Sequence, residues 1–375
     1  MTYRTNQSEK RVLFVGKSPP PVGGVTVYVK RVSSSLKGRT FFKYLNTGKE
    51  DMNLDFFQYF SFIRKNNIGL LHLNGFIKGL AALRYYILKK ITGAKIIVTY
   101  HNDRFREVYY RLNMLDRLFA RIFYRNIHTL ISVKKDVDYL FVNRSRIVNI
   151  SPFIEPLREE VEAEIPEVIQ KFRERHKRLL TANASKVAFH KNEDLYGIDL
   201  AIELMRRLVQ NGRRDTGFLY MIANNNNNEY LDKMRLRIKE FNLEEHFQLI
   251  TNPIQYPAVL KISDIFIRPT NTDGDALSVR EALSMNIPTI ASDICNRPEG
   301  SILFMSRNPE DLLLKTERLL SDYEAEKRRI SGVFMDDGLM DLLHVYESLL
   351  GRNLYIDESE SINEERNRIT RQREF

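Results

Sequence analysis

Hydrophobic and polar residues follow two alternating patterns along the chain. In the first 150 residues, short apolar runs occupy 11–15, which is rich in β-branched and aromatic residues, and 69–73, 95–100 and 128–133. Each run is followed by a longer stretch with helical periodicity, and one more strand is expected within 146–156. Regular alternation of strand and helix predicts an α/β fold with a doubly wound, mainly parallel sheet.

The same alternation starts again after a charged, helical stretch. Its apolar runs are 178–184, 217–223, 247–251, 258–270 and 286–292. The chain is therefore predicted to hold two doubly wound, Rossmann-like domains that face each other across a cleft, with ligands at the carboxyl ends of the strands. The predicted segments are an N-terminal domain (1–155), a linker (156–177), a C-terminal domain (178–335), a helix that could cross back to the first domain (336–351), and a charged tail, frayed or disordered (352–375).

Length and composition narrow the class of protein. A chain of 375 residues is long for one domain, and 43% hydrophobic with 28% charged residues is typical of a soluble globular protein. No apolar run is long enough to span a membrane, and the polar N-terminus lacks a secretory signal, so a cytoplasmic location is expected. The single Cys295 has no Cys partner for a disulfide or a zinc site.

The net charge of +10 is unevenly distributed. Residues 1–150 contain 27 Lys and Arg against 9 Asp and Glu, whereas the remainder contains 31 against 39. A basic first half predicts a polyanionic partner such as anionic lipid or a phosphate-bearing substrate. No nucleic-acid-binding motif accompanies the charge, so nucleic acid is not an expected partner.

The most informative segment is 264–300. Asp273 and Glu281 are eight residues apart, followed by Ala282-Leu283, by Pro288 and by an apolar strand. In this pattern the chain resembles the retaining glycosyltransferases of the GT-B fold, in the large family 4 group, where a Glu is more usual at the first acidic position. The resemblance covers roughly residues 11–350, is strong in this segment and is looser elsewhere.

The residues of this segment suit a nucleotide-sugar. A helix that begins near residue 277 would direct the backbone N–H groups of Leu277, Ser278 and Val279 toward a diphosphate. Glu281 would hold the ribose hydroxyls, and Asp273 would reach the transferred sugar as the catalytic acidic residue. The alternative is structural, with Ser278 and Glu281 as a capping box and Asp273 in a turn.

Asp273 and Asp275 also form a D-x-D pattern, which in another glycosyltransferase fold holds a divalent metal. The resemblance to GT-B implies no metal and no other cofactor. Asp136 and Asp138 repeat the pattern within a helical stretch, where a solvated helix face is the simpler interpretation.

The first half offers its own candidates. Gly23 and Gly24 lie between the first strand and its helix, where they form either a close approach to the donor phosphates or a tight turn. His101 ends a strand and matches the family's catalytic His beside the transferred sugar, unless it is a buried structural His. His72 and Asn74, at the end of the preceding strand, are weaker candidates for acceptor contacts.

One departure from the family concerns the diphosphate clamp. The family usually has an Arg after the first strand of the second domain and a Lys before a Gly in the next loop. Here Ser185 or Lys186 stands near the Arg position, and Tyr196 precedes the Gly. Lys186 and Arg268 are the available replacements, each with a surface or salt-bridge role as the alternative.

The stretch 104–125 has apolar residues at helical spacing, flanked by basic ones. Those predicted to contact a membrane surface are Arg111, Arg117, Arg121 and Arg125. Such a helix either lies in the headgroup layer or packs on its own domain.

Taken together, the residues and the resemblance predict a retaining hexosyltransferase at the cytoplasmic face of a membrane. It would move a sugar from a nucleotide-diphosphate donor, with a UDP-sugar favoured, to a lipid-linked or polysaccharide acceptor. The rival hypothesis is a non-catalytic nucleotide-sugar-binding protein of the same fold.

Overall fold

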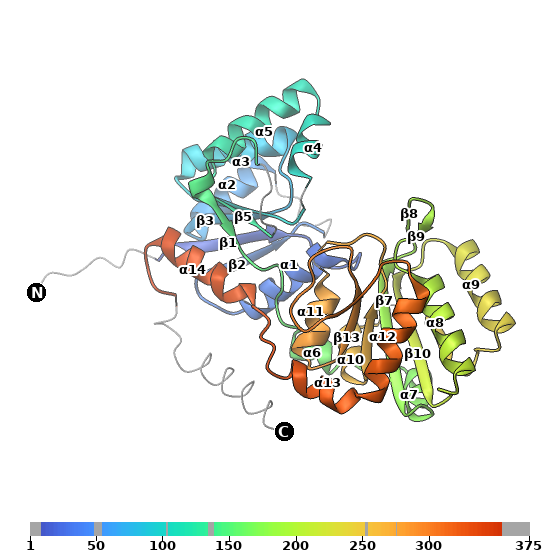
Figure 1. Cartoon of the computed structure of the whole chain (residues 1–375). Helices are drawn as coiled ribbons and strands as arrows, with labels where there is room; N and C mark the ends of the chain where they lie inside the picture. Colours follow the sequence, from blue (N-terminus) through green and yellow to red (C-terminus); the bar gives the residue numbers. More distant parts are fainter. Residues whose placement is uncertain are drawn as a thin grey trace, which may run out of the picture. The chain divides into compact units, whose positions relative to one another are not determined.

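A computed structural model describes residues 9–48, 55–102, 104–133, 139–251, 254–274 and 276–354. The chain forms two compact units. The first comprises residues 1–20, 28–154 and 337–375, and the second comprises 21–27 and 155–336. The predicted α/β class is confirmed, because each unit is built on a six-stranded parallel sheet flanked by helices (Figure 1).

The first sheet has the strand order β2-β1-β3-β4-β5-β6. Its strands are β1 (Arg11–Gly16), β2 (Phe42–Asn46), β3 (Ile68–Asn74), β4 (Lys95–Tyr100), β5 (Thr129–Ser132) and β6 (Ile147–Asn149). The central strands are buried along nearly their whole length, which explains why they read as continuous apolar runs. The edge strand β2 mixes buried, half-buried and exposed residues, and its sequence gave no strand prediction.

Helices cover both faces of this sheet. One face carries α1 (Gly24–Ser35) and α14 (Gly338–Leu350), and the other carries α2 (Phe56–Lys65), α3 (Gly79–Thr92), α4 (Phe105–Tyr110) and α5 (Met114–Asn126). Although α14 lies near the end of the chain, its buried face packs with α1 on the first sheet (Figure 1). The C-terminal helix thus belongs to the N-terminal unit.

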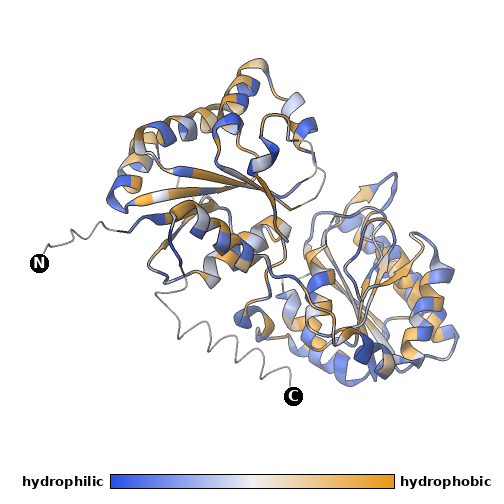
Figure 2. Cartoon of the chain, turned by 60° about the vertical axis from the view of Figure 1, so that its left-hand side comes forward, coloured by the Kyte–Doolittle hydropathy of each residue, from blue (hydrophilic) through white to orange (hydrophobic). Residues whose placement is uncertain are grey.

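The second sheet has the strand order β11-β10-β7-β12-β13-β14. Its strands are β7 (Arg178–Lys186), β10 (Thr216–Asn224), β11 (Phe247–Ile250), β12 (Ile265–Arg268), β13 (Thr289–Ser292) and β14 (Ile302–Phe304), and a short hairpin is formed by β8 (Phe189–His190) and β9 (Glu193–Asp194). The helices that follow β7 in this unit are α8 (Ile198–Gln210), α9 (Asn228–Glu240), α10 (Tyr256–Lys261), α11 (Leu277–Ser284), α12 (Pro309–Ser321) and α13 (Tyr323–Ile330). The strands are predominantly hydrophobic and the helices are amphipathic (Figure 2).

The prediction that residues 156–177 form a linker is wrong. This segment contains α6 (Arg158–Val161) and α7 (Glu167–Glu174). Ile169 and Phe172 of α7 are fully buried against Leu179 and Leu219 of the second sheet. The charged composition of the segment reflects the solvent face of an amphipathic helix that is part of the second core.

Strand order marks one position in each sheet where the direction of winding reverses. In the first sheet this position lies between β1 and β3, and in the second it lies between β7 and β12. Ligands of open α/β sheets bind outside the carboxyl ends of the strands at such positions. A ligand site in the second unit is therefore expected at the carboxyl end of β12.

Candidate functional site

Arg268 is the last residue of β12 and points to the carboxyl end of β7. Its Nε and Nη2 donate to the Asp273 carboxylate at 2.8 and 3.3 Å, and its Nη1 donates to the Asn183 carbonyl at 3.1 Å. Only 8% of the residue is exposed. A buried guanidinium therefore stands at the switch point between the two strands.

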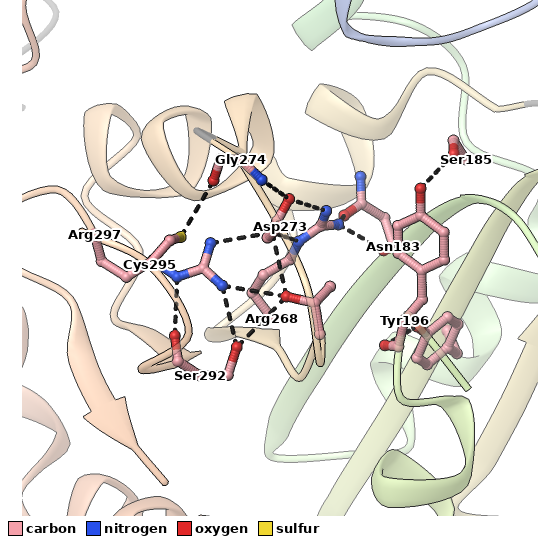
Figure 3. Close-up of polar contacts among 11 residues, drawn as sticks. Asn183, Ser185, Tyr196, Arg268, Asp273, Gly274, Ser292, Cys295 and Arg297 are labelled. Atoms are coloured by element: carbon pink, nitrogen blue, oxygen red, sulfur yellow. Dashed lines mark hydrogen bonds and ion pairs between the residues drawn. The ribbon is translucent and has the colours of Figure 1, made fainter. Parts of the chain in front are cut away.

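Asp273 is the centre of a network of donors (Figure 3). Besides Arg268, its Oδ2 accepts from Arg297 Nη1 at 3.1 Å and from Thr270 Oγ1 at 3.2 Å. Its Oδ1 accepts from the Gly274 backbone N–H at 3.0 Å. Sequence analysis assigned this carboxylate to the sugar, but in this structure its lone pairs are directed at protein donors.

The charge state of this network follows from its contacts. Burial alone would raise the pKa of Asp273, but the charges and hydrogen bonds of Arg268 and Arg297 outweigh burial and hold that pKa below its ordinary value. Burial alone would lower the pKa of Arg268, and the Asp273 charge reverses the effect. Arg268 and Asp273 are therefore charged at neutral pH, and together with Arg297 they form one cluster. We call them the RDR cluster.

Arg297 is the residue that sequence analysis missed. It lies five residues beyond the end of β13, and its side chain is 2% exposed. Its Nε donates to the Ser292 carbonyl at 3.0 Å, and its Nη2 donates to Ser292 Oγ at 3.1 Å and Thr270 Oγ1 at 3.2 Å. The sequence did offer one signal for Arg297, which is a basic residue soon after β13, at the same edge of the sheet as Arg268.

Near the two positions of the usual clamp, the neutral side chains of Ser185 and Tyr196 bind each other. Ser185 Oγ and the Tyr196 hydroxyl are 2.7 Å apart, and the Arg268 guanidinium lies 5.3 Å from the centre of the Tyr196 ring. Gly197 has φ +71°, and a Cβ there would stand 2.3 Å from the Pro269 carbonyl oxygen, so no side chain fits. Of the two predicted replacements, Arg268 belongs to the cluster and Lys186 is exposed at the end of β7.

α11 begins at Leu277 with Ala276 as its N-cap residue, and no side chain caps it. Ser278 lies inside the helix, so the capping-box interpretation of Ser278 and Glu281 is wrong. The Val279 N–H already donates to the Ala276 carbonyl at 3.1 Å, which leaves the N–H groups of Leu277 and Ser278 as the better candidates for an anion. Glu281 is buried one turn further on.

The Gly23–Gly24 loop belongs to the second unit by its contacts. Neither glycine has a positive φ, so the backbone itself does not require them. A Cβ on Gly23 would meet nothing within 4 Å, and one on Gly24 would approach Leu277 of α11 at 3.9 Å. The space beside the loop is thus open, and a close approach of the donor phosphates to the two glycines stays a prediction.

In the first unit, His101 follows β4. Its Nε2 is 3.2 Å from Asn74 Oδ1 at the end of β3, and its ring makes an edge contact with the Tyr28 ring at 4.8 Å. Asn74 also donates to the Val15 carbonyl at 3.1 Å. Burial lowers the pKa of His101 to about 4, so its imidazole is neutral at pH 7 and can exchange a hydrogen bond with a hydroxyl.

His72 lies inside the first core with no exposed surface. Its Nδ1 is 2.6 Å from the Tyr346 hydroxyl of α14, and its Nε2 is 2.7 Å from Thr99 Oγ1. Both ring nitrogens are thus used within the protein. Burial is the main cause that lowers the pKa of His72 to about 3, and the neighbouring His101 lowers it further. The predicted acceptor contact for His72 is therefore corrected, since the ring joins β3 to α14 instead.

The basic helix stretch is divided between α4 and α5. Arg117 donates through Nε to the Leu112 carbonyl at 2.8 Å, and Arg111 pairs with Glu107. Arg121 and Arg125 are exposed. The helix packs through Ala120, Phe123 and Tyr124, whereas its apolar residues Met114, Leu115 and Leu118 are 83%, 63% and 50% exposed. The predicted apolar face is thus split between a buried and an exposed part.

In the part of the chain that the structure describes, no helix is long and apolar enough to cross a membrane. The His, Cys, Asp and Glu side chains of the same residues form no group of three that could hold a metal ion. Asp136, Asp138 and Asp275 lie outside the described residues.

Comparison with known proteins adds a family and a fold. Residues 169–332 match the family described as glycosyl transferases group 1, a range that holds β7, Arg268, Asp273 and Arg297. No curated protein matches the sequence.

Several solved structures share the fold over most of the chain. A glycosyltransferase from Rickettsia africae is 17% identical with a TM-score of 0.64, and the match covers 91% of this chain and 99% of that one. Anabaena HepE, solved in complex with UDP, is 10% identical with a TM-score of 0.62, covering 90% and 99%. WaaG, a glycosyltransferase involved in lipopolysaccharide biosynthesis, is 11% identical with a TM-score of 0.56, covering 88% and 98%.

At these identities the solved structures establish the fold alone. The family match concerns residues 169–332, which lie in the second unit. Two parallel Rossmann-like sheets, with the matching segment in the second, are the architecture of those glycosyltransferases. Residues 169–332 of the second unit thus match glycosyl transferases group 1, and the chain has the GT-B fold of the solved glycosyltransferases.

Proposed function

We propose that the chain transfers a hexose from a UDP-sugar, with retention at the anomeric carbon, to a lipid-linked or polysaccharide acceptor at a membrane surface. The observation that carries the donor assignment is the buried guanidinium of Arg268 at the switch point of the second sheet. A diphosphate leaving group needs positive charge and N–H donors as the glycosidic bond breaks. Arg268 and the start of α11 supply both in the proposed site.

UDP is favoured as the donor nucleotide because a structure of the same fold, Anabaena HepE, was solved with UDP. In the proposed site, the Leu277 and Ser278 N–H groups bind a donor phosphate and Glu281 binds the ribose. A donor phosphate oxygen then accepts the acceptor proton, so no protein general base is required. His101, neutral at pH 7, contacts a hydroxyl of the transferred sugar.

No metal is required in this proposal, because Arg268 and backbone N–H groups provide the charge stabilisation that a metal would give. We expect transfer to persist in EDTA. Loss of transfer in EDTA, with recovery on adding Mn²⁺ or Mg²⁺, would overturn this part of the proposal and favour a metal site at Asp273 and Asp275.

The direct test is a panel of UDP-, GDP-, ADP- and dTDP-sugars incubated with purified protein and membrane extract. We expect labelled sugar to enter the lipid or polysaccharide fraction from a UDP-sugar only, with the anomeric configuration of the donor retained. Binding of UDP without any transfer across the panel would contradict the proposal and leave a nucleotide-sugar-binding protein.

The membrane part of the proposal rests on α5. Its exposed residues Met114, Leu115 and Leu118 would enter the acyl boundary, and Arg121 and Arg125 would remain with anionic headgroups. Each basic residue near an anionic surface contributes about 1 kcal/mol to binding. WaaG, which acts in lipopolysaccharide biosynthesis, shares the fold and agrees with a lipid-linked acceptor.

Vesicle co-sedimentation tests this surface. We expect the wild type to bind vesicles that contain anionic lipid, and we expect Arg121→Glu/Arg125→Glu to be released at moderate salt. A matched control is Arg235→Glu, an exposed Arg on α9 of the second unit, which should bind like the wild type. Equal sedimentation of the wild type and the double variant would contradict the membrane assignment.

A further inference from the structure

The RDR cluster contains more positive charge than its own carboxylate can balance. Arg268 and Arg297 contribute two positive charges, and Asp273 contributes one negative charge. Among the described residues, the other contacts of Arg297 are with Ser292 and Thr270, which are neutral. The other contacts of Arg268 are with Asn183 and the Tyr196 ring. One positive charge is therefore left over within the cluster.

A surplus buried charge needs a reason, because burial of an unbalanced ion is costly. The Arg268–Asp273 pair alone would be neutral and would already join β12 to the loop before α11. Adding Arg297, with a side chain 2% exposed, makes the cluster cationic. A purely structural network would be complete without that second guanidinium.

The surplus charge lies where an anion is expected. The cluster joins the carboxyl ends of three neighbouring strands, through Asn183 of β7, Arg268 of β12 and Ser292 of β13 (Figure 3). The loop that carries Asp273 leads directly into α11, whose first turn is not capped by a side chain. These are independent reasons for a negatively charged ligand at the same edge.

We propose that Arg297 is the residue that makes the donor-diphosphate site cationic. It offsets the negative charge of Asp273, so that Arg268 keeps a net positive field toward the diphosphate, and it fixes the Asp273 carboxylate against Arg268. Because all its nitrogens are occupied by protein acceptors, Arg297 acts through Asp273 and Arg268 as a positioning residue. This inference rests on the proposed nucleotide-diphosphate donor.

The test varies the charge of the cluster and measures the affinity for UDP and for inorganic pyrophosphate by calorimetry. Arg297→Gln leaves a balanced Arg268–Asp273 pair, so the variant should fold and should bind both probes about tenfold more weakly or worse. Arg297→Gln/Asp273→Asn restores one net positive charge and should recover most of the lost affinity. Arg297→Lys keeps the charge and should bind UDP within about fivefold of the wild type.

A second readout is the dependence of affinity on salt concentration. The slope should become shallower in Arg297→Gln and return toward the wild-type value in the double variant, because it reports the charge that faces the ligand. The control is Arg178→Gln. Arg178 also pairs with a buried carboxylate, Asp264, but at the opposite, amino-terminal end of β7, so its loss should leave both affinities unchanged.

The outcomes separate this inference from the proposed function. If the wild type binds UDP but Arg297→Gln binds it equally well, or the double variant is weaker than the single one, then Arg297 has only a structural role. If Arg297→Lys is folded but loses as much affinity for UDP as Arg297→Gln, the charge argument is also wrong. If the wild type binds neither UDP, GDP nor pyrophosphate, the proposed function falls together with this inference.

Discussion

At the carboxyl ends of their central strands, the second unit gathers charged side chains and the first unit gathers neutral ones. In the RDR cluster, Arg268 and Arg297 form ion pairs with Asp273, and hydrogen bonds to Asn183 and Ser292 connect the cluster to β7 and β13. In the first unit, Tyr346, His72 and Thr99 form a hydrogen-bonded chain, and the Tyr28 hydroxyl extends it from Thr99. Both histidines there, His72 and His101, are neutral at pH 7 because burial lowers their pKa.

The difference indicates what each unit is built to bind. Charged ligands are stabilised by charge held in fixed geometry, whereas uncharged hydroxyls are recognised by neutral donors and acceptors without the cost of burying an ion. Under the proposed function, the charged cluster of the second unit would bind the diphosphate. In the first unit, His101 would contact a hydroxyl of the sugar, whereas the buried His72 has both ring nitrogens occupied within the protein. The following predictions test this division, from the largest expected effect to the smallest.

The largest effect is expected from Arg268→Met. Removing a preorganised group that stabilises leaving-group charge typically lowers kcat by about 10²–10³-fold. We expect a loss of this size in sugar transfer, with an unchanged circular dichroism spectrum. His101→Ala in the first unit should cost less, because it removes one neutral hydrogen bond. A smaller loss for Arg268→Met than for His101→Ala would reverse the comparison.

Glu281→Ala should weaken nucleotide binding by about 1–3 kcal/mol, because polar partners in a buried position are left unmatched. Calorimetric titration with UDP measures the change. Pyrophosphate affinity should be nearly unaffected, since Glu281 is assigned to the ribose and not to the phosphates. Equal UDP affinity of the variant and the wild type would remove Glu281 from the site.

Tyr346→Phe should lower the stability of the first unit by about 1–3 kcal/mol, because the buried Nδ1 of His72 loses its partner. For domains of this size the thermal midpoint falls by about 2–4 °C per kcal/mol. Differential scanning calorimetry provides the measurement. Tyr110→Phe, at a half-exposed tyrosine of α4, is the control and should unfold like the wild type.

The smallest effect is a pH dependence of stability that differs between the units. Burial lowers the pKa of His72 to about 3 and those of His101 and His128 to about 4. In the unfolded chain these histidines have their ordinary pKa of about 6.5, so on acidification they bind protons at a higher pH than in the folded protein. The first unit should therefore lose stability as pH falls from about 6.5 toward 4. In the second unit, burial lowers the pKa of His176.

Asp273 acts in a lower pH range. Its pKa is held below the ordinary value, so its contribution is present above about pH 4 and is lost only as pH falls further. Hydrogen exchange at pH 5 and pH 7, corrected for intrinsic rates, should therefore show a larger loss of protection in the first sheet than in the second. Equal losses would mean that the buried histidines do not set the difference.

Much of the fold could be predicted because central parallel strands are buried on both faces and appear as apolar runs. The run 95–100 coincides with β4, and 178–184 lies within β7. Two of the four edge strands were missed, since β2 is partly exposed and β14 has three residues. The segment 156–177 was taken as a linker because the charged face of α7 hides the buried Ile169 and Phe172.

The site was predictable in part for a related reason. Arg268 and Asp273 are five residues apart at a strand end, and their local sequence indicates a site. Arg297 joins Asp273 across 24 residues, and Tyr346 joins His72 across 274 residues. Such contacts depend on which strands and helices become neighbours, and no local spacing encodes them. The ligand contact predicted for His72 was wrong for the same reason, because its hydrogen bond to Tyr346 comes from a helix that is distant in the sequence.

The most direct test of the account compares UDP with uridine, which shares the base and the ribose but lacks the diphosphate. Titrations at low salt should show UDP binding at least about 100-fold more tightly than uridine to the wild type, a difference of about 2.7 kcal/mol. In Arg268→Met the difference should shrink below about tenfold, with uridine affinity unchanged. Equal affinity of the wild type for UDP and uridine, or an undiminished difference in Arg268→Met, would contradict the claim that this cluster binds the diphosphate.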